Sequence, residues 1–150
     1  MLPSPIKNLN LITLNRQFDN IPPSLISLLA RIVVGLIFFK SGLTKIDGFG
    51  ISENALFLFE NEYALPLIPP AFAAYMATIF ELSCPIFLFA GLFSRIAAAL
   101  LLSMTLVIQI FVYPDAYITH GLWAIALLII MRYGSGKISL DYWIIGTNYG

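Results

Sequence analysis

The segment PAFAAYMATIFELSCPIFLFAGLF, residues 70–93, decides the fold. It is long enough to cross a bilayer, because about 20 apolar residues span the hydrocarbon as a helix. Glu81 lies near its middle, and Pro85 follows four residues later. A charge at that depth costs about 2.5 to 3.5 kcal/mol on insertion scales, so it usually faces protein and marks a site. Pro85 also lacks the N–H that would bond the Glu81 carbonyl. The Glu81 carboxylate and its free carbonyl are therefore two hydrogen-bond acceptors expected at the same depth in the membrane.

The composition of the whole chain indicates an integral membrane protein. Of 150 residues, 59% are hydrophobic and 11% are charged, which leaves too little polar surface to coat a soluble particle. Three further apolar stretches, 24–44, 94–113 and 117–133, are long enough to be spanning helices. The sequence therefore predicts an all-α fold, a four-helix transmembrane bundle in a lipid bilayer.

Basic and acidic residues separate onto opposite sides of this bundle. Their numbers are equal at eight each, so no cationic surface favours nucleic acid as a partner. One side carries Lys7, Arg16, Arg95, Arg132 and Lys137; the other carries Asp47, Glu53, Glu60, Glu62 and Asp115. Basic residues mark the cytoplasmic side, so both termini are expected there, in a bacterial inner (plasma) membrane.

The chain is expected to form a single membrane domain with two short extensions. Residues 1–23 lack the apolar core and cleavage site of a signal peptide and should form a cytoplasmic arm. Residues 24–143 form the domain, and 144–150 a tail. Within the first acidic-side loop, 46–69, Ser52 and Glu53 precede an amphipathic run, which predicts a short capped helix on the membrane surface. This helix is either a spacer or a lid over the bundle.

The first span carries one stripe of special residues. Arg31, Gly35, Phe38, Gly42 and Lys45 follow steps of four, three, four and three, so they share a face that must contact protein. Counting helix rise from opposite membrane edges places Arg31 and Glu81 within about 6 Å of each other in depth. We therefore expect these two charges to be coupled, directly or through a water or a ligand oxygen.

Several polar residues leave structural and functional interpretations open. His120 begins the fourth span and either forms a structural hydrogen bond or handles a proton. Gln109 either bonds a neighbouring helix or serves a ligand. The chain has a single histidine, which excludes two-histidine haem ligation. Cys84 is its single cysteine, so it cannot exchange a disulfide as the two thiols of a CxxC motif do. The chain also carries no GxGxxG for a flavin and no metal-ligand motif.

An ordered set of residues resembles the DoxX family of small four-helix membrane proteins. It covers about residues 24–143 and comprises Arg31, Gly35, Gly42 and Lys45, then Glu81, Gly91, Leu92 and Arg95, then His120, and finally the closing stretch 134–141. The family is named after the membrane subunit of a thiosulfate:quinone oxidoreductase, so the resemblance implies a quinone-linked redox role. Residues 57–70 further resemble members encoded beside enzymes that make copper-binding peptides, which implies a peptide-maturation partner.

Quinone chemistry needs an apolar slot, donors for two carbonyls and a proton acceptor. Glu81 and His120 are the candidate proton-handling residues. The candidate donors are Arg31, Lys45 and Gln109, while Phe38 and Phe80 are candidates to bound the ring. Two alternatives stay open: a non-enzymatic scaffold or assembly factor whose buried charges fix helix register, and a small-solute transporter. If electrons move, their carrier must be a lipid-soluble quinone or belong to an oxidoreductase partner, and a homo-oligomer is also open.

Overall fold

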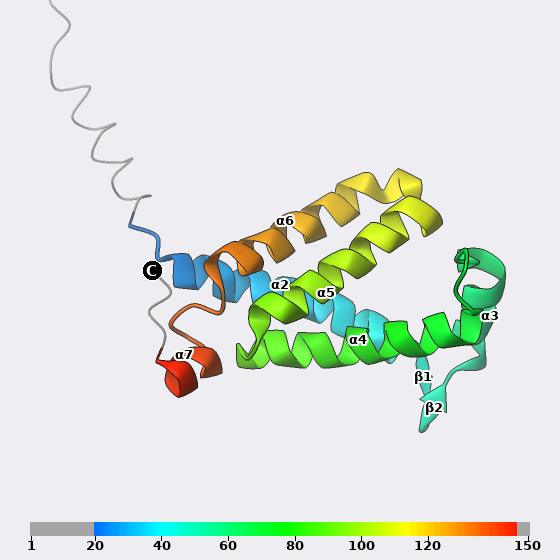
Figure 1. Cartoon of the computed structure of the whole chain (residues 1–150), viewed down its shortest axis with the longest axis horizontal. Helices are drawn as coiled ribbons and strands as arrows, with labels where there is room; N and C mark the ends of the chain where they lie inside the picture. The colour runs from blue at the N-terminus through cyan, green and yellow to red at the C-terminus, as the bar shows by residue number, and fades with distance from the viewer. Residues whose placement is uncertain (1–19, 147–150) are drawn as a thin grey trace, which may run out of the picture.

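The computed structural model describes residues 20–146, and in this part of the chain four long helices pack as a bundle (Figure 1). They are α2 (Pro23–Leu43), α4 (Pro70–Ala90), α5 (Ser94–Val107) and α6 (Tyr117–Tyr133). A π-helical segment, η2 (Ile108–Val112), extends α5, and a 3-10 turn, η3 (Pro114–Ala116), precedes α6. All four are apolar and long enough to cross a membrane, which confirms the predicted spans. The predicted arm, residues 1–23, lies almost wholly outside the described residues, as does most of the tail.

The turn between α4 and α5 is held by the end of the chain. Gly91 ends α4 with a left-handed backbone, φ 67°, which glycine adopts without the steric cost of a Cβ. The short helix α7 (Leu140–Ile145) packs on this turn. The Asp141 N–H donates to the Gly91 carbonyl at 3.0 Å, and its carboxylate accepts the Phe93 N–H at 3.1 Å. Asp141 thus satisfies backbone groups that a tight helical hairpin would otherwise leave open.

The opposite end of the bundle is covered by the segment between α2 and α4. It forms a small antiparallel hairpin, β1 (Ile46–Asp47) with β2 (Gly50–Ile51), then α3 (Glu53–Leu58) and a π-helical turn, η1 (Phe59–Tyr63). The Ser52 hydroxyl accepts the Ala55 N–H at 3.2 Å, so the predicted capped helix is confirmed. The hairpin was not predicted from the sequence, because two-residue strands carry no alternation that could reveal them.

The helices α2 and α4 pack closely but are staggered along their axes. A Cβ added to Gly42 would lie 3.1 Å from Glu81 Cβ, and one added to Gly91 would lie 2.1 Å from an Arg31 nitrogen. Gly42 is therefore level with Glu81, and Arg31 is level with Gly91. Because Glu81 is eleven residues into α4, that helix continues about 16 Å past the level where α2 ends. The segment from β1 to η1 occupies the space that a longer first helix would fill.

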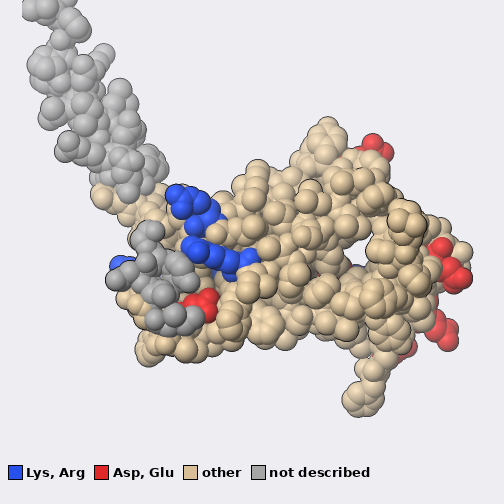
Figure 2. All heavy atoms as spheres, viewed as in Figure 1, with Lys and Arg blue, Asp and Glu red and all other residues tan. Residues whose placement is uncertain are grey.

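Charged side chains gather at the two ends of the bundle and leave a wide apolar band between them (Figure 2). Exposed Arg95, Arg132 and Lys137 lie at the end formed by the α4–α5 turn and the end of α6. Exposed Glu53, Glu60, Glu62 and Asp115 lie at the other. These are called the basic end and the acidic end below. This distribution of charge is the one expected if the helices cross the bilayer and the two ends of the bundle lie in water.

Candidate functional site

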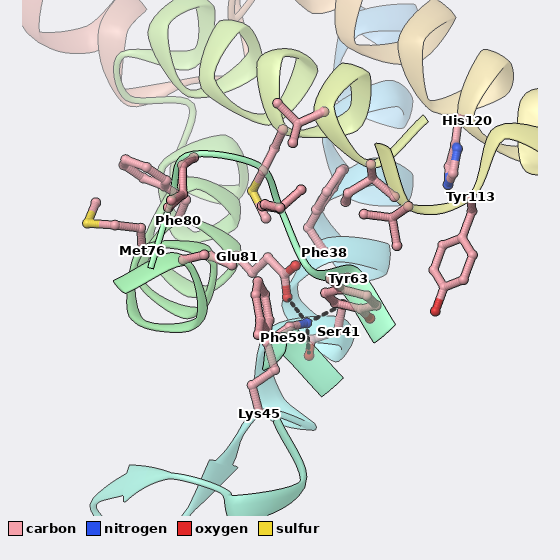
Figure 3. Close-up of a pocket in the computed structure, with 18 of the residues that line it drawn as sticks. Phe38, Ser41, Lys45, Phe59, Tyr63, Met76, Phe80, Glu81, Tyr113 and His120 are labelled. Atoms are coloured by element: carbon pink, nitrogen blue, oxygen red, sulfur yellow. Dashed lines mark hydrogen bonds and ion pairs between the residues drawn. The ribbon is translucent and has the colours of Figure 1, made fainter. Parts of the chain in front are cut away.

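A cavity of about 300 Å³ opens inside the acidic half of the bundle (Figure 3). Its walls come from α2, α4, α5, α6 and the covering segment, and they are mainly aromatic, aliphatic and methionine side chains. The polar exceptions are Ser41, Lys45, Glu81, His120 and two tyrosines. The cavity exists because α2 stops early, so the first turns of α4 and the last turns of α5 have no first-helix neighbour.

An ion pair between Lys45 and Glu81 is the central polar feature of the cavity. The Lys45 Nζ donates to Glu81 Oε2 at 2.6 Å, to the Ser41 hydroxyl at 3.0 Å and to the Ser41 carbonyl at 3.2 Å. All three ammonium hydrogens therefore have an acceptor. Glu81 is only 3% exposed, and its second carboxylate oxygen keeps the capacity to accept a further hydrogen bond.

The local fold fixes Lys45 at this position. Its N–H donates to the Gly42 carbonyl at 3.1 Å, which closes the last turn of α2. Its carbonyl accepts the Ser52 N–H at 2.9 Å, which ties the start of β1 to the start of α3. Lys45 is thus held from both sides, and its side chain turns back toward α4. Gly42, one turn before it, gives Glu81 room to approach.

His120 lines another part of the cavity wall, and its tautomer follows from its partner. The Gln109 amide group, Nε2, donates to the Pro114 carbonyl at 2.6 Å, so Gln109 Oε1 is the acceptor atom. That oxygen lies 2.7 Å from His120 Nδ1. A carboxamide oxygen cannot donate, so Nδ1 carries the hydrogen and a neutral ring keeps Nε2 as an acceptor. Within residues 20–146 no protein partner is found for Nε2.

Aromatic side chains from the covering segment close the cavity at the acidic end. Phe59 is buried and meets Tyr63 edge-on, with ring centroids 4.8 Å apart. Tyr63 in turn meets Tyr113, at 5.9 Å, and the Tyr113 hydroxyl donates to the Glu62 carboxylate. Burial raises the pKa of Tyr63 above its ordinary 10.0, and the bond to Glu62 raises the pKa of Tyr113. Both phenols are therefore neutral at physiological pH.

The predicted coupling of Arg31 with Glu81 is wrong. Arg31 lies near the basic end, where its Nη2 donates to the Ile138 carbonyl at 2.7 Å and Asp141 supplies the attractive charge. The depth estimate failed because it assumed that α2 and α4 begin and end at the same levels. The stagger instead places Glu81 level with Gly42, which is eleven residues of helix beyond Arg31. The buried stripe itself is confirmed: Arg31, Gly35, Phe38 and Gly42 all face protein.

The structure brings most of the other predicted residues together. Lys45, Glu81, His120, Phe38 and Phe80 line the cavity, whereas Gln109 lies behind His120 and contacts it through a hydrogen bond. Sequence reasoning missed Ser41, Phe59, Tyr63, Met76, Met104 and Trp123. Two of these carried a usable signal, since Ser41 precedes Lys45 by one helical turn and Trp123 follows His120 by three residues. The others are apolar or aromatic and look like ordinary membrane-helix residues.

The described bundle, with a polar pair inside an apolar cavity, defines a small four-helix integral membrane protein. Residues 26–114, more than half of the chain, match the DoxX family, and the chain belongs to that family. It is also 29% identical over 127 residues to an uncharacterized protein of Haemophilus influenzae (strain ATCC 51907 / DSM 11121 / KW20 / Rd). That similarity covers 76% of this chain and 80% of the relative. No solved structure matches.

Proposed function

We propose that this protein binds the ring of a lipid-soluble quinone in the cavity and serves as a quinone-linked membrane subunit of an oxidoreductase system. The observation that supports this proposal is the buried Lys45–Glu81 pair on the wall of an otherwise apolar cavity. A volume of about 300 Å³ is at the small end of ligand sites, which suits one substituted ring rather than a large cofactor.

The residues around the pair meet the needs of a quinone ring. Phe38 and Phe80 supply flat apolar walls, and Phe38 is held by an edge-on contact with Trp123 at 5.4 Å. The Lys45 ammonium has two hydrogen bonds to Ser41, one of which a ring carbonyl can replace. The Glu81 oxygen that does not bond Lys45 is the acceptor for a quinol hydroxyl.

Proton transfer can be assigned to two groups of this chain. Oxidation of a quinol releases two protons and two electrons. Glu81 takes one proton, and the unprotonated Nε2 of His120 takes the other. Figure 3 shows these groups at separate points of the cavity wall, as the two hydroxyls on opposite carbons of a quinol ring require. The two electrons pass to the redox centre of a partner oxidoreductase. In quinone reduction, the partner supplies two electrons, and Glu81 and His120 each return one proton to the ring.

Trp123 makes the binding step directly measurable. The chain has two tryptophans, and Trp143 is far from the cavity, on α7. In a Trp143→Phe protein in lipid nanodiscs, a tail-bearing benzoquinone should quench the Trp123 fluorescence saturably. Glu81→Gln in that background should weaken the binding about tenfold, equal to about 1.4 kcal/mol. Ser83→Ala is the matched control and should bind normally, because the Ser83 hydroxyl donates to the Ile79 carbonyl of its own helix and Ser83 does not line the cavity.

Quenching that rises linearly with quinone in the membrane, and that is the same for Trp123 and for a Trp123→Phe protein retaining Trp143, is collisional and shows no site. Such a result would rule out the proposed function.

One observation favours a second candidate, a non-enzymatic scaffold or assembly factor. The Lys45–Glu81 pair joins the end of α2 to the middle of α4 and fixes how the two helices align. A buried polar pair can serve such a registry role without any ligand. Well-packed apolar side chains can hold the same two helices together, so this candidate predicts that a Lys45→Met/Glu81→Met protein keeps its partner interactions and that the parent protein shows no saturable quinone binding. The quinone proposal predicts that the parent binds quinone and that the double variant does not.

We further propose that the basic end faces the cytoplasm of a bacterial cell. The exposed arginines and lysine at that end are the supporting observation, because cytoplasmic loops of membrane proteins are enriched in these residues. A reporter that is active only in the cytoplasm, fused after Gly150, should be active. Activity of a periplasm-specific reporter at the same place would reverse the orientation.

A further inference from the structure

We infer that the ligand enters the cavity sideways from the bilayer, through a gap between α4 and α5, and leaves its apolar tail in that gap. The ligand class is thus a ring compound with a long hydrocarbon tail, taken from the half of the bilayer at the acidic end. This inference rests on the proposed function, because it assumes a ring held beside Lys45 and Glu81. It adds the route and the position of the tail.

The acidic end of the cavity is closed to water by the covering segment. Ala55 and Phe59 are buried, and Phe59 packs on Ala73, Ala74 and Ala77 of α4. The hydrogen bond from Tyr113 to Glu62 fastens η1 to the connection between α5 and α6. A ligand arriving from the aqueous side would have to lift this segment and break both contacts.

The side that faces lipid is open. The helices α4 and α5 are joined by a tight turn at the basic end, and they diverge toward the acidic end (Figure 1). Near the turn the small residues Ala97 and Ala98 are fully packed. Seen from the side, the surface has an opening in the region where the two helices have separated (Figure 2). The opening lies in the apolar band of the bundle, where lipid tails surround the protein.

Some residues of α4 and α5 both line the cavity and are exposed on the lipid-facing surface beside the gap. Phe72 of α4 is 59% exposed and Val107 of α5 is 37% exposed, although both contribute to the cavity wall. Met76 of α4 and Met104 of α5 also line the cavity and are half-buried. Methionine is unbranched and adapts its shape readily, so these two side chains can move aside for a chain and close around it.

The π-helical end of α5 contributes to the gap. Five residues, Ile108–Val112, form a wider turn than an α-helix, and two of them line the cavity, Ile108 and Val112. Such segments often occur at functional sites. Polar groups lie deep in the cavity and apolar groups lie along the gap, so a ligand with a polar ring and an apolar tail has only one matching orientation.

The position of the tail can be mapped by photolabelling. The probe is a benzoquinone with a ten-carbon chain that ends in a diazirine, added to the full-length protein in nanodiscs. After illumination, mass spectrometry should find the label on the gap residues Phe72, Met76, Met104 and Val107. Excess unlabelled decyl-benzoquinone should compete it away. Competed label on α3 or η1, with Trp123 quenching intact, overturns the lateral route and leaves the proposed function standing.

Loss of both signals has a different meaning. If neither competed labelling nor saturable Trp123 quenching is seen, no quinone binds, and the proposed function fails together with this inference.

A pair of substitutions tests the gap itself. Val107→Trp places a large side chain across it and should reduce the competed labelling about tenfold. Ile110→Trp introduces the same side chain three residues further on, in η2, at an exposed residue that does not line the cavity, and labelling should persist. Equal labelling of both proteins would overturn the route. Thermal unfolding of both proteins checks that each is folded.

Discussion

Lys45 and Glu81 form an ion pair, 2.6 Å from Nζ to Oε2, at a level where α2 has just ended and α4 is halfway through its span. The counter-ion of the Glu81 carboxylate is therefore Lys45, which lies just after the end of α2. The sequence predicted a counter-ion from the same helix, but it pointed to Arg31. Each charge depends on the other, since neither has an alternative partner of opposite charge among residues 20–146.

The first prediction concerns the stability of this pair. Glu81→Gln leaves the Lys45 ammonium buried without its counter-ion, and we expect a loss of about 3 to 5 kcal/mol in the free energy of unfolding. Replacing both residues by methionine removes both charges and should recover most of that loss, because well-packed apolar replacements of buried pairs are often neutral. Reversible unfolding in detergent measures all three proteins. A double variant as unstable as Glu81→Gln would contradict the pairing.

The second prediction concerns the packing of the basic end on Gly91. Gly91→Ala places a Cβ 2.1 Å from an Arg31 nitrogen and 2.9 Å from the Ser139 backbone, at a φ of +67°. Left-handed backbone costs about 1 to 2 kcal/mol without glycine, and overpacking typically adds about 1 to 3 kcal/mol. We therefore expect a marked fall in the unfolding midpoint. Gly121→Ala is the matched control, since no neighbouring atom lies within 4 Å of the added Cβ. Similar losses in both would refute this packing.

The third prediction concerns the tautomer of His120. Nitrogen-15 NMR of the single histidine should show a protonated Nδ1 and an unprotonated Nε2 in the neutral ring, because Gln109 Oε1 accepts from Nδ1. Gln109→Leu removes this acceptor and should mix the two tautomers. Thr105→Val is the control, because the Thr105 hydroxyl bonds the Leu101 carbonyl of its own helix. A dominant Nε2–H signal in the parent protein would contradict the assignment.

The fourth prediction concerns the closure of the acidic end at high pH. The bond to Glu62 raises the pKa of Tyr113 above its ordinary value of 10.0 in the folded protein. The folded state thus holds the phenol proton more tightly than the unfolded chain, so the stabilisation is complete below about pH 10 and falls as pH rises further. Ultraviolet difference spectra of the parent and of Tyr113→Phe should show one tyrosine ionising late. Its ionisation at or below pH 10 would contradict the hydrogen bond.

Much of the fold was predictable, because it depends on local signals. The four spans follow from length and apolarity, which the membrane itself demands, and the short helix follows from Ser52 as its cap. The buried face of α2 was also evident, since Arg31, Gly35, Phe38 and Gly42 recur with helical spacing.

The partner of Glu81 was not predictable in the same way. It depends on how far α2 slides along α4, and this stagger is set by contacts between distant residues, such as Gly42 with Leu82 and Gly91 with Arg31. Helical spacing predicts that Lys45 lies on the stripe, but it does not fix the depth of Lys45 relative to α4. The cavity walls were hidden for another reason, because residues such as Met76 and Met104 match the composition of any lipid-facing helix.

The early end of α2 makes the protein sensitive to the thickness of its membrane. The residues after Leu43 begin about 16 Å deeper in the bundle than Pro70, the first residue of α4. The segment of β1, β2 and α3 therefore starts at a depth where hydrocarbon chains can contact it. A bilayer of longer lipids would surround this cover, and one of shorter lipids would raise it toward water. Occupancy of the cavity should therefore change with acyl-chain length, which would link the binding site to the state of the surrounding lipid.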